Sequence, residues 1–359
     1  MMKNKSKNVN KSRRDFLKKS SVAFLGVSIL PSHVIAGLGH TPPSDKLNIA
    51  GIGVGGMGRN NLSNIKNQNI VALCDVDWTY AKRCFDDYPG IKKFKDYRVM
   101  LDKMENQIDA VVIATPAHSH YEIALAFLKA GKDVFIEKPM TLCSKDAKEL
   151  VDVAQLGGAI LMVGHMLLYQ PAIQFIKSYL DQGHIGQIYH LHQERLKLGR
   201  VRSKENVVWS LGVHDIAVLL YLVGSAPQEI KCSAHSGVQK LIEDDAYLHM
   251  TFESGTIAHL HSSWLWPENS RCMRIVGSKG MVVYDEMNQT VTLHKKSIGK
   301  DLENIDDGEE LLFEGCSQPL RLEMEHFIHC IKTRENPTSD GLSGLTVIQV
   351  LESLELSNS

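Results

Sequence analysis

Residues 47–58 join an apolar, strand-like segment directly to a turn that contains four glycines, and a helical pattern follows. Such a turn lets a strand pass at once into a helix, and its backbone can approach a pyrophosphate at the helix N-terminus. The spacing Gly-x-Gly-x-x-Gly fits in two registers, one beginning at Gly51 and one at Gly53. The register of Gly53, Gly55 and Gly58 is favoured because it leaves a full strand before the first glycine. The turn therefore predicts a dinucleotide-binding parallel sheet.

Strands and helices continue to alternate after this turn, as far as Gly164. The chain of 359 residues exceeds one typical domain of about 100–200 residues, which suggests two domains. The alternation predicts an α/β fold whose N-terminal part is a Rossmann-type, doubly wound parallel sheet. Strands are expected at 47–52, 70–74, 110–114, 133–136 and 160–163, and helices at 119–130 and from Ser144 onward.

Residues 187–296 have a different character, because several segments alternate apolar and polar residues in the manner of half-buried strands. One helix interrupts them at about 213–222, and two more are expected at 320–333 and 345–356. This order predicts a C-terminal α+β domain with a mostly antiparallel sheet.

Asp75 ends the second predicted strand, where an acidic residue accepts hydrogen bonds from the adenosine ribose hydroxyls. A carboxylate there would repel a 2′-phosphate, so the sequence favours NAD over NADP as the cofactor. The third predicted strand ends in Thr115 and Pro116, and with His118 these residues are expected to line the nicotinamide side of the site. Alternatively, His118 and His120 only cap the helix that follows.

Glu137, Lys138 and Pro139 close the apolar run 134–136, so a cation stands at the end of a strand that should be buried. In an open α/β sheet, ligands bind outside the carboxyl ends of the strands. A lysine at this place can bring an ammonium group to a bound substrate, or a free amine where its pKa is lowered. The alternative is a structural ion pair between Lys138 and Glu137.

Several short motifs follow one another in a fixed order along the chain. They are Ala114-Thr115-Pro116 with His118 and His120, Glu137-Lys138-Pro139, Gly164-His165 with Tyr169 and Pro171-Ala172, Gly183 with Gly186, and Gly212-Val213-His214-Asp215-Ile216. In order and spacing these motifs resemble the glucose–fructose oxidoreductase/inositol dehydrogenase (Gfo/Idh/MocA) family, and the resemblance runs from Leu47 to the C-terminus. The segments 198–209 and 263–271 resemble a subgroup linked to the oxidation of sugars and nucleotide sugars.

The resemblance implies that Lys138 and His214 are the catalytic residues and face the nicotinamide across a cleft between the domains. Oxidation of a secondary alcohol removes a hydride from carbon and a proton from oxygen. A histidine has a suitable pKa for taking the proton, and a lysine can hydrogen-bond the developing oxyanion. The cofactor-binding residues expected are Gly53, Gly55, Gly58, Asp75, Thr115, Pro116, His118, Glu137 and Lys138. The candidates for substrate contact are His165, Tyr169, Arg200, Arg202, Trp209, Ser210, Asp215 and Arg271.

Ser210 departs from the family pattern, since many relatives carry an aspartate four residues before the catalytic histidine, on the same helix face. A serine can hydrogen-bond a substrate hydroxyl, but it cannot act as a carboxylate base or hold His214 protonated by its charge. Asp215 is next to His214 and is expected to point elsewhere on the helix, toward a neighbouring loop or another part of the site.

These features predict an NAD(P)-dependent oxidoreductase that transfers a hydride between nicotinamide and a secondary alcohol of a sugar, sugar derivative or polyol, with a tightly held cofactor. Two alternatives remain: an NAD-dependent glycoside-cleaving enzyme that works by oxidation and elimination, and a non-catalytic sugar or dinucleotide sensor. The formal net charge of −1, without a large charge block, argues against a nucleic-acid partner. Dispersed cysteines without a C-x-x-C pair argue against a zinc site. The resemblance also suggests a homo-oligomer, either a dimer or a tetramer.

The N-terminus has the three regions of an export signal, namely a basic stretch up to Lys18, the apolar segment 22–30 and small residues near position 36. Arg13 and Arg14, followed by Phe-Leu-Lys, resemble a twin-arginine signal, which predicts the twin-arginine export machinery as a partner and a periplasmic location. The alternatives are a disordered basic tail and a cytoplasmic protein. The expected organisation is a signal peptide at 1–36, a linker at 37–46, an NAD-binding Rossmann domain at 47–165, and an α+β substrate and oligomerisation domain at 166–359.

Overall fold

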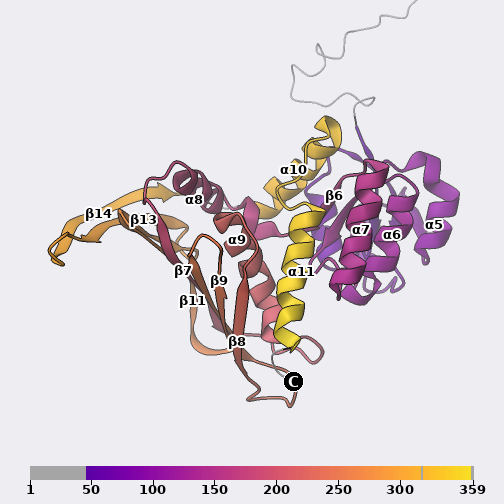
Figure 1. Ribbon diagram of the computed structural model, residues 1–359. Helices are drawn as coiled ribbons and strands as arrows, with labels where there is room; N and C mark the ends of the chain where they lie inside the picture. Colours follow the sequence, from indigo (N-terminus) through magenta and orange to yellow (C-terminus); the bar gives the residue numbers. More distant parts are fainter. Residues whose placement is uncertain (1–45, 317, 357–359) are drawn as a thin grey trace, which may run out of the picture. The chain divides into compact units, whose positions relative to one another are not determined.

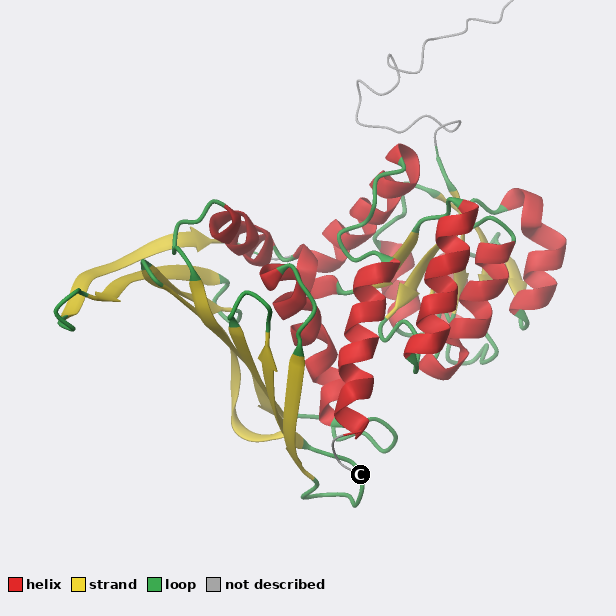
Figure 2. Cartoon of the chain, viewed as in Figure 1, coloured by secondary structure: helices red, strands yellow, loops and turns green. Residues whose placement is uncertain are grey.

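The computed structural model describes residues 46–316 and 318–356. The predicted signal peptide and the linker up to residue 45 lie outside the described residues. Residues from Leu47 onward form one compact unit, whose helices and strands are drawn in Figures 1 and 2. No helix within the described residues is both long enough and apolar enough to cross a membrane.

The first sheet contains six strands in the order β3-β2-β1-β4-β5-β6, and all neighbouring pairs run parallel. Every residue of β4 and β5 is buried, as expected for a sheet covered on both faces. The predicted doubly wound parallel sheet is confirmed, although β3 was not foreseen. The strands are β1 (Asn48–Ile52), β2 (Asn69–Cys74), β3 (Lys92–Phe94), β4 (Ala110–Ile113), β5 (Asp133–Glu137) and β6 (Leu161–Gly164).

The order of these strands reverses direction between β1 and β4. The chain steps from β1 outward to β2 on one side and from β4 outward to β5 on the other, so right-handed crossovers place α3 and α6 on opposite faces of the sheet. The carboxyl ends of β1 and β4 are therefore the switch point at which such a sheet binds ligands. The helices of this part are α3 (Met57–Ser63), α4 (Lys82–Asp87), α5 (Tyr97–Met104), α6 (His120–Lys129) and α7 (Ser144–Gly157), with short turns η2 (Glu105–Gln107) and η3 (Ala117–Ser119).

The second sheet contains eight strands in the order β14-β13-β12-β11-β7-β10-β9-β8. All neighbours are antiparallel except β7 and β10, which confirms the mostly antiparallel sheet. The sequence did not single out β8, β12 or β14; the edge strands β8 and β14 carry mostly exposed side chains and show little alternation. The strands are β7 (Ile188–Leu198), β8 (Glu229–His235), β9 (Asp245–Thr251), β10 (Ile257–Ser263), β11 (Leu265–Gly277), β12 (Gly280–Asp285), β13 (Thr290–Ile298) and β14 (Asn304–Glu314).

Helices from the second half of the chain contact both parts of the unit. α11 (Gly341–Leu356) packs against α7 and against α9 (Val213–Val223), and Figure 1 shows it between them. α10 (Pro319–Thr333) packs against α3 and the short turn η4 (Met166–Tyr169). A π-helical turn, η5 (Val208–Gly212), leads directly into α9. The remaining helix is α8 (Pro171–Asp181).

Candidate active site

The glycine turn has the geometry that a dinucleotide requires, in the register of Gly53, Gly55 and Gly58. Gly53 has a φ of +75°, and a Cβ there would lie 2.7 Å from the backbone of Ala114. A Cβ on Gly58 would lie only 2.1 Å from the carbonyl oxygen of Gly53, so the helix can approach the strand this closely only without a side chain. The turn leaves its backbone open to a pyrophosphate, and NAD fits this cradle.

A tyrosine lies over the same turn and was missed in the sequence. A Cβ placed on Gly55 would come within 2.1 Å of the ring of Tyr80, and one on Gly56 within 2.6 Å of its hydroxyl oxygen. The Tyr80 side chain is otherwise 66% exposed, so it covers the turn from the solvent side. A single aromatic residue shortly after an acidic strand end carries no recognisable pattern, which is why sequence reasoning passed over it.

A cleft of about 770 Å³ lies at the switch point of the parallel sheet. The turn, the end of β2 and the exit of β4 line it, including Asp75, Thr115, Pro116 and His118. The carboxylate of Asp75 accepts a hydrogen bond from the Asp77 backbone at 2.9 Å. The structure thus brings these predicted cofactor residues to one cleft with Gly53 and Gly55, whereas the predicted residues Gly58, Glu137 and Lys138 do not line it.

The two neighbouring histidines have different places. His118 lines the cleft, whereas His120 is buried and both of its ring nitrogens lie 2.8 Å from carbonyl oxygens, those of Pro139 and Thr115. Burial lowers the pKa of His120. His120 therefore ties the exit of β4 to the exit of β5, while His118 is free to contact a ligand.

Lys138 reaches from the end of β5 to η5, the turn that precedes α9. Its Nζ donates a hydrogen bond to the carbonyl oxygen of Ser210 at 3.0 Å. Its neighbour Glu137 is buried and accepts from Asn61 Nδ2 at 2.8 Å. Burial lowers the pKa of Lys138, although the negative charges of Glu137 and Glu205 oppose the shift. A lysine with a lowered pKa can exchange a proton with a substrate more readily than an ordinary surface lysine.

His214 and His165 form the other side of this centre. Nδ1 of His214 and both ring nitrogens of His165 are buried without a hydrogen-bond partner among the described residues. Burial, and then the charge of Lys138, lowers the pKa of His214 well below its ordinary value and that of His165 to about 3. Both imidazoles are therefore neutral near pH 7, with a lone pair that can accept a proton, although each is a weaker base than an ordinary histidine.

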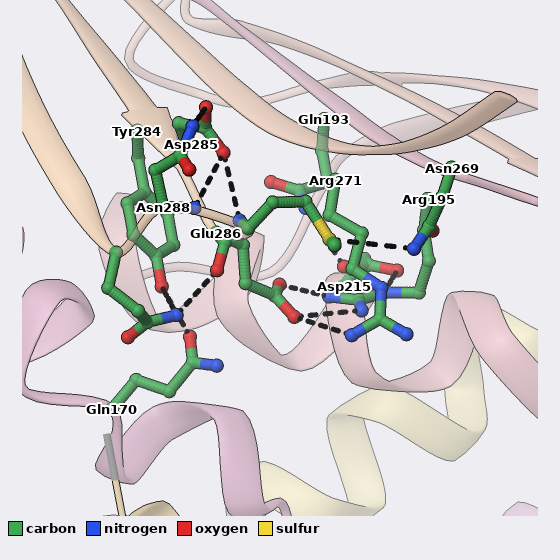
Figure 3. A network of polar contacts seen from close by, with 12 residues as sticks. Gln170, Gln193, Arg195, Asp215, Asn269, Arg271, Tyr284, Asp285, Glu286 and Asn288 are labelled. Atoms are coloured by element: carbon green, nitrogen blue, oxygen red, sulfur yellow. Dashed lines mark hydrogen bonds and ion pairs between the residues drawn. The ribbon is translucent and has the colours of Figure 1, made fainter. Parts of the chain in front are cut away.

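The predicted substrate residue Asp215 is committed to a buried network instead (Figure 3). Its carboxylate accepts from Arg195 Nε at 2.7 Å and from Gln193 Nε2 at 3.0 Å. The same arginine donates to Glu286 at 2.8 Å, and Arg271 donates to Glu286 at 3.1 Å. Asp215 is fully buried, so its carboxylate holds α9 against the second sheet and is not directed at a substrate.

The other substrate candidates lie in three different places. Tyr169 is buried, and its hydroxyl forms a 2.9 Å hydrogen bond with Ser339, so the structure does not bring it to the site. Arg200 and Arg202 are exposed on the loop that leads to η5. Trp209, on η5, lines a second cavity of about 440 Å³, together with Pro139, Glu205, Asn206 and Glu243. Pro139 is the residue after Lys138, so this second cavity adjoins the lysine.

Fold and site together are those of a two-domain oxidoreductase that works with a bound dinucleotide. Residues 47–165 match the family described as "Oxidoreductase family, NAD-binding Rossmann fold", and residues 173–283 match the GFO/IDH/MocA C-terminal domain. The chain belongs to the GFO/IDH/MocA oxidoreductase family. The predictions of this family, of NAD as the cofactor and of an oxidoreductase are thereby confirmed.

Characterised relatives give the range of activities in the family. UDP-N-acetylglucosamine 3-dehydrogenase of Acidithiobacillus ferrooxidans is 30% identical over 251 residues, covering 69% of this chain and 78% of that protein. Its solved structure superposes with a TM-score of 0.77 at 27% identity over 87% of this chain and 97% of that one. The 2,7-anhydro-N-acetylneuraminate hydratase of Mediterraneibacter gnavus is 28% identical over 50% of this chain and 51% of that protein.

Proposed function

We propose that this protein catalyses NAD-dependent oxidation or reduction of a secondary hydroxyl on a sugar, a sugar derivative or a polyol. The proposal rests on one contact above all, the 3.0 Å hydrogen bond from Lys138 Nζ to the carbonyl oxygen of Ser210. This contact joins the end of β5, the strand beside β4, to the turn that leads into the helix of His214. The similarity to a UDP-N-acetylglucosamine dehydrogenase supports a sugar derivative as the substrate class.

The residues of this chain divide the work of binding and proton transfer. The turn of Gly53, Gly55 and Gly58 would hold the pyrophosphate of NAD, and Asp75 the adenosine ribose. When bound, NAD supplies the acceptor or donor of the hydride. Lys138 Nζ would leave Ser210 to hydrogen-bond the substrate oxygen and stabilise the charge that develops on it. The neutral imidazole of His214 would take the proton from the hydroxyl.

The first experiment uses purified protein, NAD and a panel of sugars, and measures formation of NADH. Lys138→Met and His214→Asn should each lower kcat by about 10²- to 10⁴-fold, the usual contribution of a positioned acid or base. Affinity for NAD should stay within about twofold, because the glycine cradle remains. Lys145→Met, at an exposed position on α7, is the matched control. Full activity in both site variants would overturn the proposal.

A second reaction class fits the same residues. A transient oxidation would acidify a neighbouring C–H bond and allow elimination, with no net NADH, as in a glycoside-cleaving enzyme. The similarity to an anhydro-sugar hydratase favours testing this class. A product assay separates the two, because simple redox accumulates NADH and a ketone whereas elimination releases free sugar and regenerates NAD. A sensor would show neither, and its ligand binding would survive in Lys138→Met.

Export through the twin-arginine route and retention of NAD within the site belong together in this proposal. A periplasmic enzyme meets little free NAD, so the cofactor would be loaded before export and recycled in place. Cell fractionation of wild type and of an Arg13→Lys, Arg14→Lys variant tests the route, and chromatography of the denatured mature protein tests for bound dinucleotide. A cytoplasmic wild type would favour the alternative location. We also propose a homo-oligomer, which light scattering measures directly.

A further inference from the structure

Glu323 is a buried carboxyl group that the proposed chemistry does not use. It lies on α10, its exposed fraction is 0%, and neither carboxyl oxygen has a hydrogen-bond partner among the described residues. Burial raises the pKa of Glu323 well above its ordinary value, and the negative charge of Glu137 adds to the shift. A carboxylate left in such a place without a donor would be strongly unfavourable, so a neutral acid is expected.

The packing of α10 shows where Glu323 points. Phe327, one helical turn later, makes an edge contact with Phe135, with ring centroids 5.6 Å apart. Residues i and i+4 share one face of a helix, so Glu323 lies on the face that carries Phe327. Residues i and i+2 share one face of a strand, so Glu137 lies on the face that carries Phe135. Glu323 therefore faces the residue that immediately precedes Lys138.

Asn61 completes this cluster from α3, a helix that packs against α10. Its Nδ2 donates to Glu137 Oε1 at 2.8 Å, while its Oδ1 is buried without a partner among the described residues. The Lys138 backbone donates to Glu137 Oε2 at 3.3 Å. Glu137 thus receives the donors suited to an anion, and Glu323 receives none. A neutral Glu323 would add an O–H donor to this buried cluster, in which Asn61 Oδ1 has no donor among the described residues.

We propose that Glu323 is a positioning residue that stays protonated and so keeps the single negative charge of this cluster on Glu137, beneath Lys138. Two buried carboxyl groups that face each other cannot both ionise at low cost. A charge on Glu137 favours the ammonium form of Lys138, and a charge moved to Glu323 would favour it less. The role rests on the proposed function, because it acts through the lysine assigned to the substrate oxygen.

Few titratable groups bear on this assignment. Among the described residues on the elements packed against α10, Glu137 on β5 and Tyr169 on η4 interact with Glu323. Tyr169 stays neutral, since burial raises the pKa of its hydroxyl. Glu323 acts on Lys138 only through Glu137, whose negative charge raises the pKa of the lysine. The proton on Glu323 is therefore held first by burial and then by the negative charge of Glu137.

The protonation of Glu323 can be tested without any turnover. In the unfolded chain a glutamate ionises above pH about 4.5, whereas Glu323 in the folded protein would stay protonated. Above that pH the folded protein therefore holds a proton that the unfolded chain has lost, and wild type loses stability as pH rises. Glu323→Gln removes this loss. Its Tm should rise relative to wild type as pH increases from about 5 to about 8, and Glu325→Gln, exposed on the same helix, should show no trend. Parallel Tm curves for wild type and Glu323→Gln would overturn the proposal, even if no sugar is ever turned over.

The effect on Lys138 needs the active enzyme. Glu323→Gln keeps a neutral donor and should leave the pH profile of kcat within about 0.3 pH units of wild type. Glu323→Leu removes the donor and favours protonation of Glu137, which lowers the pKa of Lys138. The alkaline limb of the profile, where the Lys138 ammonium loses its proton, should therefore move to lower pH, in the same direction as in Glu137→Gln. Affinity for NAD, which reports folding of the cofactor half, should not change in Glu323→Gln. An identical profile in wild type, Glu323→Leu and Glu137→Gln would show that Glu323 has only a packing role.

Discussion

The cofactor half of the site takes its shape mainly from backbone, and the substrate half takes its shape mainly from side chains. At the cofactor cleft the essential shape comes from backbone, with Gly53, Gly55 and Gly58 so close to their neighbours that a Cβ would collide. Beside α9 the shape comes from side chains, with Arg195 held between Asp215 and Glu286 by hydrogen bonds of 2.7 and 2.8 Å. The glycines of the first construction lie in one short turn, although Gly53 packs against Ala114 and Gly55 against Tyr80. The second construction joins residues 20 and 91 positions apart.

The two halves therefore tolerate different substitutions. A backbone cradle tolerates no added atom but depends on few distant residues. A side-chain network tolerates neighbouring substitutions but fails when its central member is lost, because charged groups are then buried without partners. The family therefore can keep one cofactor while the substrate half takes different forms.

The largest effect should come from Arg195→Met. It leaves Asp215 and Glu286 buried without their shared cation, and the loss of free energy of unfolding should be about 3–5 kcal/mol. Chemical denaturation measures it. Arg274→Met is the control, since Arg274 is half-exposed and pairs with Glu194 at 3.3 Å, and it should cost less than about 1 kcal/mol. Equal costs in the two variants would show that the substrate half does not depend on its network.

Gly58→Ala should come next and act on the other half. The added Cβ would lie 2.1 Å from the Gly53 carbonyl oxygen, which must open the turn. Affinity for NAD should fall about 100-fold, equivalent to about 2.8 kcal/mol, by titration calorimetry. Gly157→Ala, where nothing lies within 4 Å of the added Cβ, should leave NAD binding unchanged. A Gly58→Ala protein that binds NAD normally would remove the argument for a backbone-built cradle.

His165→Asn should change how the stability of the protein depends on pH. The pKa of His165 is lowered to about 3, so between that value and about 6.5 the unfolded chain binds a proton that the folded one does not, and stability falls as pH falls. At pH about 5 the variant should avoid up to about 2 kcal/mol of this loss. Thermal unfolding at pH about 7 and about 5 measures it. A steeper acid loss in the variant than in wild type is the contrary result.

The smallest effect expected is that of Tyr80→Ala. Its ring lies against Gly55 and its hydroxyl near Gly56, so it should slow the escape of a bound dinucleotide. Dissociation of NAD, followed by stopped-flow fluorescence, should become about fivefold faster, or about 1 kcal/mol. Tyr189→Ala, half-exposed on β7, serves as the control. Unchanged dissociation would leave the backbone as the main source of cofactor retention.

The sequence predicts the turn and the strand ends that line the cofactor cleft, because these signals are local, but it does not predict Tyr80. The glycine spacing, the acidic end of β2 and Lys138 at the end of β5 each follow from a few adjacent residues. The substrate half is predicted less well. Its position beside His214 suggests that Asp215 is a site residue, and only the structure shows that it pairs with Arg195, because this pairing depends on the register of the second sheet. The position of Glu323 cannot be predicted from the sequence for the same reason, because only the packing of α10 places it opposite Glu137.

Lys138 donates its hydrogen bond to a carbonyl oxygen, an atom that every amino acid supplies. A change of residue at position 210 therefore alters what the side chain offers a substrate while the lysine keeps its acceptor. The contact depends on the backbone path of the π-helical turn and not on the side chain at that position. Evolution could thus revise the chemistry of the site one residue at a time, with the lysine already in place.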